Sequence, residues 1–269
     1  MAEKQVLVIM GSPRKGNTYR ACEVLREVVQ QQIPAEFEYL WLKDANLSPC
    51  KGCLACFAYG EERCPLLDDA PAMLEMMNRA DMVVFASPVY GMNVSGIFKT
   101  FIDRFSFVFH RPRFFDKKAF LLVTTGVMGE DDVLRYLDQV ARIWGFEVIG
   151  RAGLVTPSGT FAGKRAEEHG WIIAKAAADI AAALQRPARA SPGLMDVIVF
   201  HAQRAVFALL ETESPADFQY WQEKGWLAPD ARYFVDVPVN PLYTAIGRIV
   251  GWYQARRTRH DLEHSAEPA

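Results

Sequence analysis

The sequence predicts an α/β protein with a doubly wound parallel sheet of five strands, followed by a helical, aromatic-rich C-terminal extension. Three observations support this fold class: five apolar segments alternate with five helical patterns, turn residues follow the segments, and the pattern changes after a Pro- and Ala-rich stretch near residue 186. Alternation of this kind is typical of a parallel sheet with helices on both faces. With 269 residues, of which 51% are hydrophobic, the chain is long enough for one large core.

The first apolar segment, Val6 to Met10, stops at Gly11 and suits a strand buried on both faces. A helix is expected from about Thr18 to Gln31, where apolar residues recur at helical spacing. Further strands are expected at 37–42, 82–86, 119–124 and 148–155, and further helices near 69–79, 96–109, 131–144 and 163–185. Because ligands of such sheets bind beyond the carboxyl ends of the strands, the informative loops are 11–18, 87–95 and 125–130.

We expect two parts, a sheet domain at 1–185 with a cysteine insert at 48–69, and a helical extension at 186–269. Residues 194–210 are apolar, but polar residues interrupt them and they are too short for a membrane span, so a packed helix is predicted. The aromatic stretch 217–234 is expected to pack internally, with the lining of a substrate pocket as the alternative.

The last helix is expected to begin at Asn240-Pro241, with Asn as the cap and Pro in the first position. Its apolar stripe comprises Leu242, Ala245, Ile246, Ile249, Val250 and Tyr253. We expect this stripe to cover the main domain or a partner subunit.

The loop after the first strand reads Gly11-Ser-Pro-Arg-Lys-Gly-Asn-Thr18 and is predicted to bind a phosphate. The phosphate loop of nucleotide hydrolases carries a lysine at the position of Asn17, so that class is disfavoured. A single terminal phosphate, such as that of flavin mononucleotide (FMN), suits N–H groups at a helix N-terminus together with the Ser12 and Thr18 hydroxyls. A plain strand-to-helix turn is the alternative.

Four cysteines, Cys50, Cys53, Cys56 and Cys64, follow the spacing C-x2-C-x2-C-x7-C. This spacing suits one small inorganic centre, whereas cysteines three apart rarely reach disulfide geometry without strain. A [4Fe–4S] cluster is the preferred prediction, a thiol-bearing loop without metal is the first alternative, and tetrahedral zinc is the second. The fifth cysteine, Cys22, lies in a helical pattern and is expected to be a small buried residue.

Two later motifs make a family resemblance specific. The second loop begins Ser87-Pro-Val-Tyr90, and the next helix contains Lys99-Thr-Phe-Ile-Asp-Arg104. Together with the first loop, these motifs resemble the NADPH-dependent FMN reductase family, over roughly residues 5–155. The four cysteines and the Asp68-Asp69 pair beyond them resemble its iron–sulfur flavoprotein branch. The resemblance implies a flavodoxin-like fold, bound FMN, a cluster on the four cysteines, and a homodimer or homotetramer in which a neighbour's insert can complete the flavin site.

The resemblance also implies individual roles: the first loop holds the FMN phosphate, the second borders the flavin ring, and the loop after the fourth strand supplies backbone donors. The expected FMN residues are Ser12, Arg14, Gly16, Asn17, Thr18, Pro88, Val89, Tyr90, Gly91, Met92, Asn93, Thr125, Gly126 and Val127. Fixed N–H donors suit a ring that gains negative charge on reduction, so the flavin, rather than a catalytic side chain, is expected to carry the chemistry. Lys99, Asp103 and Arg104 are expected to form structural ion pairs.

We therefore predict an enzyme, an FMN-dependent oxidoreductase that takes electrons from NAD(P)H or a ferredoxin-like donor. The electrons pass to a small-molecule or protein acceptor through the flavin, with or without the cluster. A non-enzymatic electron carrier and an FMN or quinone reductase without a cluster are the alternatives. The formal charge of −2 supplies no basic face for nucleic acid, and the N-terminus shows no secretory pattern, so a cytoplasmic protein is expected.

Overall fold

The computed structural model describes residues 3–156, 164–186 and 188–265. The chain forms two compact units. The sheet unit comprises Met1–Cys50, Asp68–Ser106 and Phe114–Ala188, and the helical unit comprises Lys51–Leu67, Phe107–Arg113 and Arg189–Ala269. Most of the cysteine insert thus groups with the C-terminal extension, an association that the order of elements along the chain did not indicate.

Five parallel strands form the sheet unit's centre, in the order β2-β1-β3-β4-β5. They are β1 (Lys4–Met10), β2 (Ala35–Trp41), β3 (Met82–Pro88), β4 (Lys118–Thr125) and β5 (Glu147–Val155). The predicted doubly wound sheet is confirmed, and the strands lie where the apolar segments were, with small differences at their ends. Since the strand order reverses between β1 and β3, their carboxyl ends form the crevice where such sheets bind ligands.

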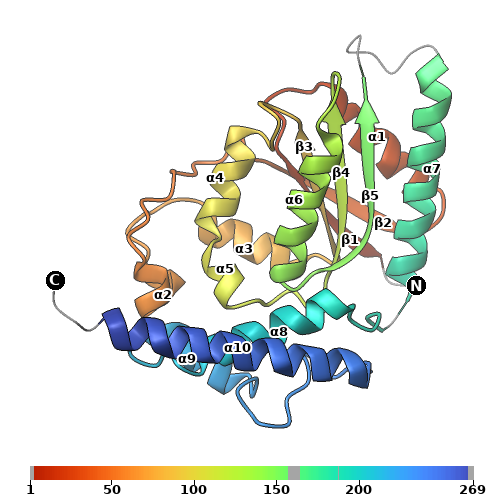
Figure 1. The fold of residues 1–269 in the computed structure, drawn as a ribbon. Coiled ribbons are helices and arrows are strands. Elements are labelled where there is room, and N and C mark those ends of the chain that lie inside the picture. Colours follow the sequence, from red (N-terminus) through yellow and green to blue (C-terminus); the bar gives the residue numbers. More distant parts are fainter. Residues whose placement is uncertain (1–2, 157–163, 187, 266–269) are drawn as a thin grey trace. The chain divides into compact units, whose positions relative to one another are not determined.

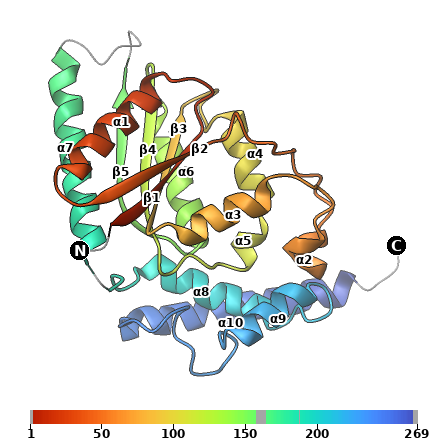
Figure 2. The same cartoon turned by 180° about the vertical axis from the view of Figure 1, so that it is seen from behind.

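Helices cover both faces of this sheet (Figures 1 and 2). One face carries α1 (Asn17–Gln30) and α7 (Lys164–Gln185), and the other carries α4 (Gly96–Arg104) and α6 (Glu130–Ile143), while α3 (Ala70–Arg79) packs against β1. Cys22 is buried between α1 and the sheet, as expected. The helix expected over 96–109 ends at Arg104, and the chain leaves the sheet unit after Ser106 and continues as a short helix, α5 (Phe107–His110).

The helical unit contains α2 (Ala55–Tyr59), a 3₁₀ turn (Glu61–Arg63), α5, α8 (Leu194–Phe207), α9 (Pro215–Glu223) and α10 (Pro241–Ser265). Two glycines let α10 approach α8 closely: a Cβ added to Gly247 would lie 2.5 Å from His201 Cδ2, and one added to Gly251 would lie 2.7 Å from His201 O. The aromatic stretch packs internally, with Trp221, Trp226 and Tyr233 buried. No helix within the described ranges is long and apolar enough to cross a membrane.

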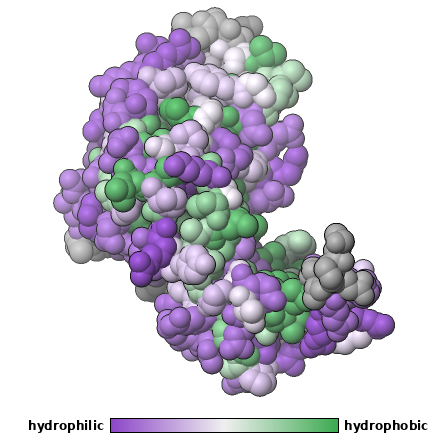
Figure 3. All heavy atoms as spheres, turned by 90° about the vertical axis from the view of Figure 1, so that its left-hand side faces the viewer, coloured by the Kyte–Doolittle hydropathy of each residue, from purple (hydrophilic) through white to green (hydrophobic). Residues whose placement is uncertain are grey.

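Some large apolar side chains reach the surface, and Figure 3 shows hydrophobic patches between hydrophilic residues on the face that it draws. Three members of the apolar stripe predicted for α10, namely Leu242, Ile249 and Tyr253, are at least 60% exposed. Since α10 packs on α8 through its glycines, the predicted stripe lies on a different side of the helix from this contact.

Candidate functional site

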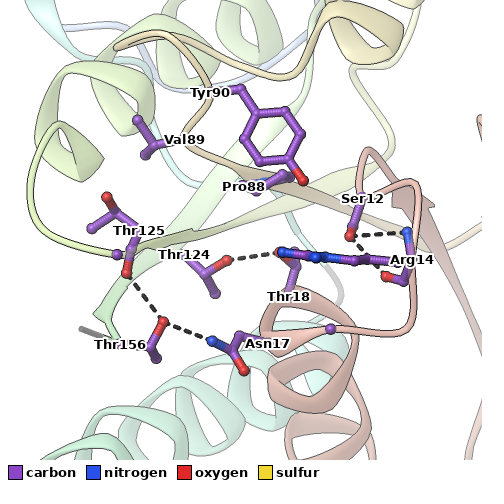
Figure 4. A pocket seen from close by; sticks show the side chains of 12 residues that line it. Ser12, Arg14, Asn17, Thr18, Pro88, Val89, Tyr90, Thr124, Thr125 and Thr156 are labelled. Atoms are coloured by element: carbon purple, nitrogen blue, oxygen red, sulfur yellow. Dashed lines mark hydrogen bonds between the residues drawn. The ribbon is translucent and has the colours of Figure 1, made fainter. Parts of the chain in front are cut away.

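A cavity of about 270 Å³ lies at the carboxyl ends of the central strands, where the three predicted loops meet (Figure 4). Its lining comprises Ser12, Arg14, Gly16, Asn17, Thr18, Pro88, Val89, Tyr90, Thr124, Thr125, Gly126 and Thr156. The structure thus gathers most of the residues expected to bind FMN, although Gly91, Met92, Asn93 and Val127 are not among the lining residues. Thr124 and Thr156 were missed. Each lies at or just after the end of a strand, and this position is the signal that could have identified them.

The first turn of α1 offers an anion site within this cavity. The helix begins at Asn17 with Gly16 as its N-cap, and neither a capping side chain nor an acidic residue occupies its first turn. Its N–H groups and the positive end of the helix dipole are therefore available to a negative ligand. The Arg14 side chain lies over Gly16, since a Cβ added there would be 3.6 Å from both Cγ and Nε of Arg14. This arrangement suits a phosphate.

The two hydroxyls expected to donate to a phosphate are both buried and both already bonded within the protein. Ser12 Oγ donates to the Arg14 carbonyl over 2.8 Å and so shapes the loop. Thr18 Oγ1 and Thr124 Oγ1 lie 2.7 Å apart, and this bond uses only one of their two protons. The pair can therefore donate the second proton to a ligand, whereas Ser12 acts mainly through the loop's shape.

The Asn17 side chain, on the cavity lining, is held by a hydrogen bond to Thr156. Its Nδ2 donates to Thr156 Oγ1 over 2.9 Å, and Thr156 Oγ1 donates to the Thr125 carbonyl over 3.1 Å (Figure 4). The Asn17 Oδ1 atom is buried and has no hydrogen-bond partner. The side chains of Asn17 and Thr156 are polar groups of the kind that bind the hydroxyls of the ribityl chain of FMN, so the lining fits this cofactor.

The second loop contains a tight turn, which explains why part of the loop is absent from the lining. Tyr90 and Asn93 exchange backbone hydrogen bonds of 2.9 and 3.1 Å across Gly91 and Met92, whose φ angles are 55° and 64°. Two consecutive left-handed residues define a type I′ turn. The turn holds Tyr90 at the cavity. The Met92 side chain packs towards Gly129 on the third loop, since a Cβ added to Gly129 would lie 3.2 Å from Met92 Cε.

Hydrogen bonds join the first two loops. Ser95 caps α4 by accepting from the Phe98 N–H and donates its own proton to the Gly11 carbonyl over 2.6 Å. Position 11 requires glycine, because a Cβ there would come within 2.4 Å of Phe98. Residues 84 positions apart are thereby fixed together at the crevice.

The four cysteines of the insert, unlike the residues of the cavity, are not brought together by the fold. Cys50 and Cys53 are exposed, and Cys56 and Cys64 are half-buried. Among the residues that the structure describes, no group of three or more His, Cys, Asp or Glu side chains is arranged to hold a metal ion. Four thiols at this spacing are the right donors for an iron–sulfur cluster, but their arrangement does not form its cage.

The ion pairs expected in the helix after the second loop are present. Lys99 and Asp103 pair on the surface at 2.5 Å, whereas Arg104 and Asp68 form a buried pair at 2.8 Å. Asp68 also accepts from the backbone N–H of Ser48, which ties the two ends of the insert together. Burial alone would raise the pKa of Asp68, but hydrogen bonds from Arg104 and the backbone hold that pKa below its ordinary value.

Comparisons with known proteins identify the family of this chain. The family model of NADPH-dependent FMN reductase matches residues 5–161. An iron-sulfur flavoprotein of Archaeoglobus fulgidus is 30% identical over 225 residues, covering 81% of this chain and 98% of that protein. A second protein of that name from the same organism is 42% identical over 100 residues, 37% of this chain and 48% of that protein.

Among solved structures, an NAD(P)H:quinone oxidoreductase from Methanothermobacter marburgensis superimposes with a TM-score of 0.53 at 18% identity. The match covers 66% of this chain and 98% of that one, and it supports the fold alone. The chain therefore belongs to the NADPH-dependent FMN reductase family, a family of FMN-dependent oxidoreductases, and to its iron–sulfur flavoprotein branch.

Proposed function

We propose that this protein binds FMN in the cavity at the carboxyl ends of β1, β3 and β4 and uses it to transfer electrons from NAD(P)H or a ferredoxin-like donor to a small-molecule or protein acceptor. The observation that carries the proposal is the uncapped start of α1, with Arg14 beside it, inside a cavity that Thr18 and Thr156 also line. A positive helix end matches the phosphate of FMN, and the polar side chains on the lining match its hydroxyl chain.

The residues divide between three tasks. The N–H groups of α1, Arg14 and the Thr18–Thr124 hydroxyl pair would hold the phosphate, and Asn17 and Thr156 would orient the ribityl chain. Pro88, Val89, Tyr90, Gly91, Met92 and Asn93 would border the ring, and Thr125, Gly126 and Val127 would offer backbone donors to it. Bound FMN supplies hydride and one-electron chemistry, and these side chains bind it, orient it and limit the access of water.

The four cysteines, in this proposal, hold one [4Fe–4S] cluster. Their spacing and the name of the 30% identical relative support the assignment. Since the thiols are not gathered, residues 50–64 must rearrange when the cluster assembles, in keeping with the coupling of metal binding to local folding. Zinc, or thiols without metal, remain the alternatives for this insert.

Donor and acceptor are tested by steady-state oxidation of NADH and NADPH by FMN-loaded protein, with quinone, free flavin and ferric acceptors. We expect turnover with at least one pair of donor and acceptor. A protein that binds FMN but turns over with none of them is the electron carrier named above, which would need a protein partner on each side. Size-exclusion chromatography with light scattering tests the proposed homodimer or homotetramer.

A further inference from the structure

A buried ion pair lies at the centre of the helical unit, next to the cysteine insert. Asp217, on α9, is completely buried, and Arg111, which follows α5, is 2% exposed. Arg111 Nη1 donates to Asp217 Oδ1. Taking two charges out of water is expensive, and the attraction between them offsets that cost only when further hydrogen bonds satisfy both groups.

Those further hydrogen bonds reach the cysteine insert. Arg111 Nη2 donates to the backbone carbonyl of Cys56 over 2.7 Å and to Glu61 Oε2 over 2.9 Å. One guanidinium therefore bridges α9 of the C-terminal extension and α2 of the insert, the short helix that contains Cys56. A lysine could not make these contacts together, because only the planar fork of arginine presents several donors in fixed directions.

Neighbouring contacts reinforce the bridge. The Asp217 Oδ2 atom lies 2.7 Å from His110 Nδ1, and the His110 ring stacks on Phe57, beside Cys56, at a centroid distance of 4.1 Å. Trp221 Nε1 on α9 donates to the His110 carbonyl over 2.7 Å. The backbone of α2 is thus held from α5 and α9 rather than by its own five residues.

Near Cys56, charged side chains pair with partners of opposite sign. Arg113 Nη1 donates to Glu61 Oε1 over 2.8 Å, so two arginines face two carboxylates, those of Glu61 and Asp217. Burial alone would raise the pKa of Glu61, but Arg113 and Arg111 beside it hold that pKa below its ordinary value. Substituting one member of this quartet therefore leaves an uncompensated charge whose sign depends on which member is removed.

We propose that Arg111 and Asp217 are positioning residues for Cys56, through which the C-terminal extension holds the cysteine insert and sets the charge around it. The part of the proposal that concerns the cluster rests on the proposed function, since it requires Cys56 to be a ligand. The part that concerns the conformation of α2 does not. Two measurements separate them.

The first measurement uses metal-free, reduced protein and follows the alkylation of each cysteine by iodoacetamide with mass spectrometry. Asp217→Asn and Arg111→Lys should each raise the alkylation rate at Cys56 by about tenfold, because α2 opens more often once its bridge is lost. Arg111→Lys keeps the positive charge and removes only the planar set of donors, so this variant is the one expected to preserve the fold. Asp179→Asn, which removes a surface ion pair with Lys175 in the sheet unit, is the control and should change nothing. Unchanged alkylation at Cys56 in both variants would overturn the positioning role.

The second measurement is the reduction potential of anaerobically assembled cluster, with iron and sulfide analysis of each sample. Arg111→Gln should lower the potential and Asp217→Asn should raise it, because added negative charge disfavours a reduced, more negative centre. A bridge with a purely structural role would not move the reduction potentials of the two variants in opposite directions. Shifts of the same sign would therefore overturn the electrostatic role. If the unsubstituted protein assembles no iron, the cluster assignment fails, and the alkylation experiment still decides the positioning role.

Discussion

The three loops at the carboxyl edge of the sheet and the cysteine insert differ in what holds them in place. The loops at the carboxyl edge of the sheet are joined to strands and to each other by buried contacts, such as the Thr18–Thr124 and Ser95–Gly11 hydrogen bonds. Residues Cys50 to Cys64 contain only a five-residue helix and a 3₁₀ turn, and side chains from distant parts of the helical unit support them. A regular sheet can thus present a ligand site that is formed in advance, whereas a short insert must obtain its shape from its neighbours and its metal.

The largest expected effect is the complete and selective loss of the cluster. Cys56→Ser should abolish the iron–sulfur centre of anaerobically assembled protein, because one of the four thiolates is removed, while FMN binding continues in the sheet unit. Iron, sulfide and flavin analyses check this prediction, with Cys22→Ser as the control for a cysteine outside the insert. Loss of FMN together with the iron would contradict the independence of the two regions.

A smaller but still large effect is expected at the phosphate end of the cavity. The double variant Arg14→Ala, Thr18→Ala should weaken FMN binding by about two orders of magnitude or more, since each charge-assisted contact is worth about 1.5–3 kcal/mol. Fluorescence titration of apoprotein measures the affinity. Arg135→Ala, which removes a comparable charge from the exposed face of α6, is the matched control. Equal affinities in the double variant and the control would remove the phosphate assignment.

The helical unit should also lose stability in mild acid. Burial, together with the charges of Arg204 and Arg248, lowers the pKa of His201 to about 4. Since an unfolded histidine titrates near 6.5, the unfolded state binds more protons as the pH falls from about 6.5 to 4, and the free energy of unfolding decreases over that range by up to about 3 kcal/mol. Above pH 6.5 this contribution is constant.

Urea unfolding at pH 7, 5.5 and 4.5, followed by circular dichroism, tests this window. The variant His201→Leu cannot titrate at this position and should show a shallower dependence on pH. Identical slopes for the two proteins would mean that His201 does not couple folding to pH. Retention of FMN at pH 5.5 would further show that the sheet unit is insensitive to this titration.

The smallest effect should come from the exposed pair in α4. Asp103→Asn removes the surface ion pair with Lys99, and such pairs, four residues apart on a helix, contribute about 0.3–0.5 kcal/mol. Thermal unfolding should therefore shift only slightly, and FMN affinity should not change. A large loss of FMN binding would give Asp103 a role at the flavin that its surface position does not suggest.

Local patterns predicted the sheet and the phosphate loop, because strand periodicity and loop motifs lie within a few residues of each other, and the family resemblance implied most of the remaining cavity lining. The threonines that complete the lining, Thr124 and Thr156, carry no motif and gain meaning only from their strand ends. The pairing of Arg111 with Asp217 joins residues 106 positions apart, and no periodicity marks either of them. Contacts of this kind depend on tertiary packing, which also explains why α9 and the grouping of the insert with the extension were missed.

The central claim is that the FMN site exists before its ligand, whereas the cysteine insert takes its final shape with its cluster. Hydrogen–deuterium exchange tests it most directly, on protein without cofactors, with FMN, and with FMN and anaerobically assembled cluster. We predict that the amides of β1 and α1 are protected from the start and gain little with FMN, and that residues 50–64 gain strong protection only with the cluster. An insert equally protected with and without bound iron, or an α1 that becomes protected only with FMN, would contradict the claim.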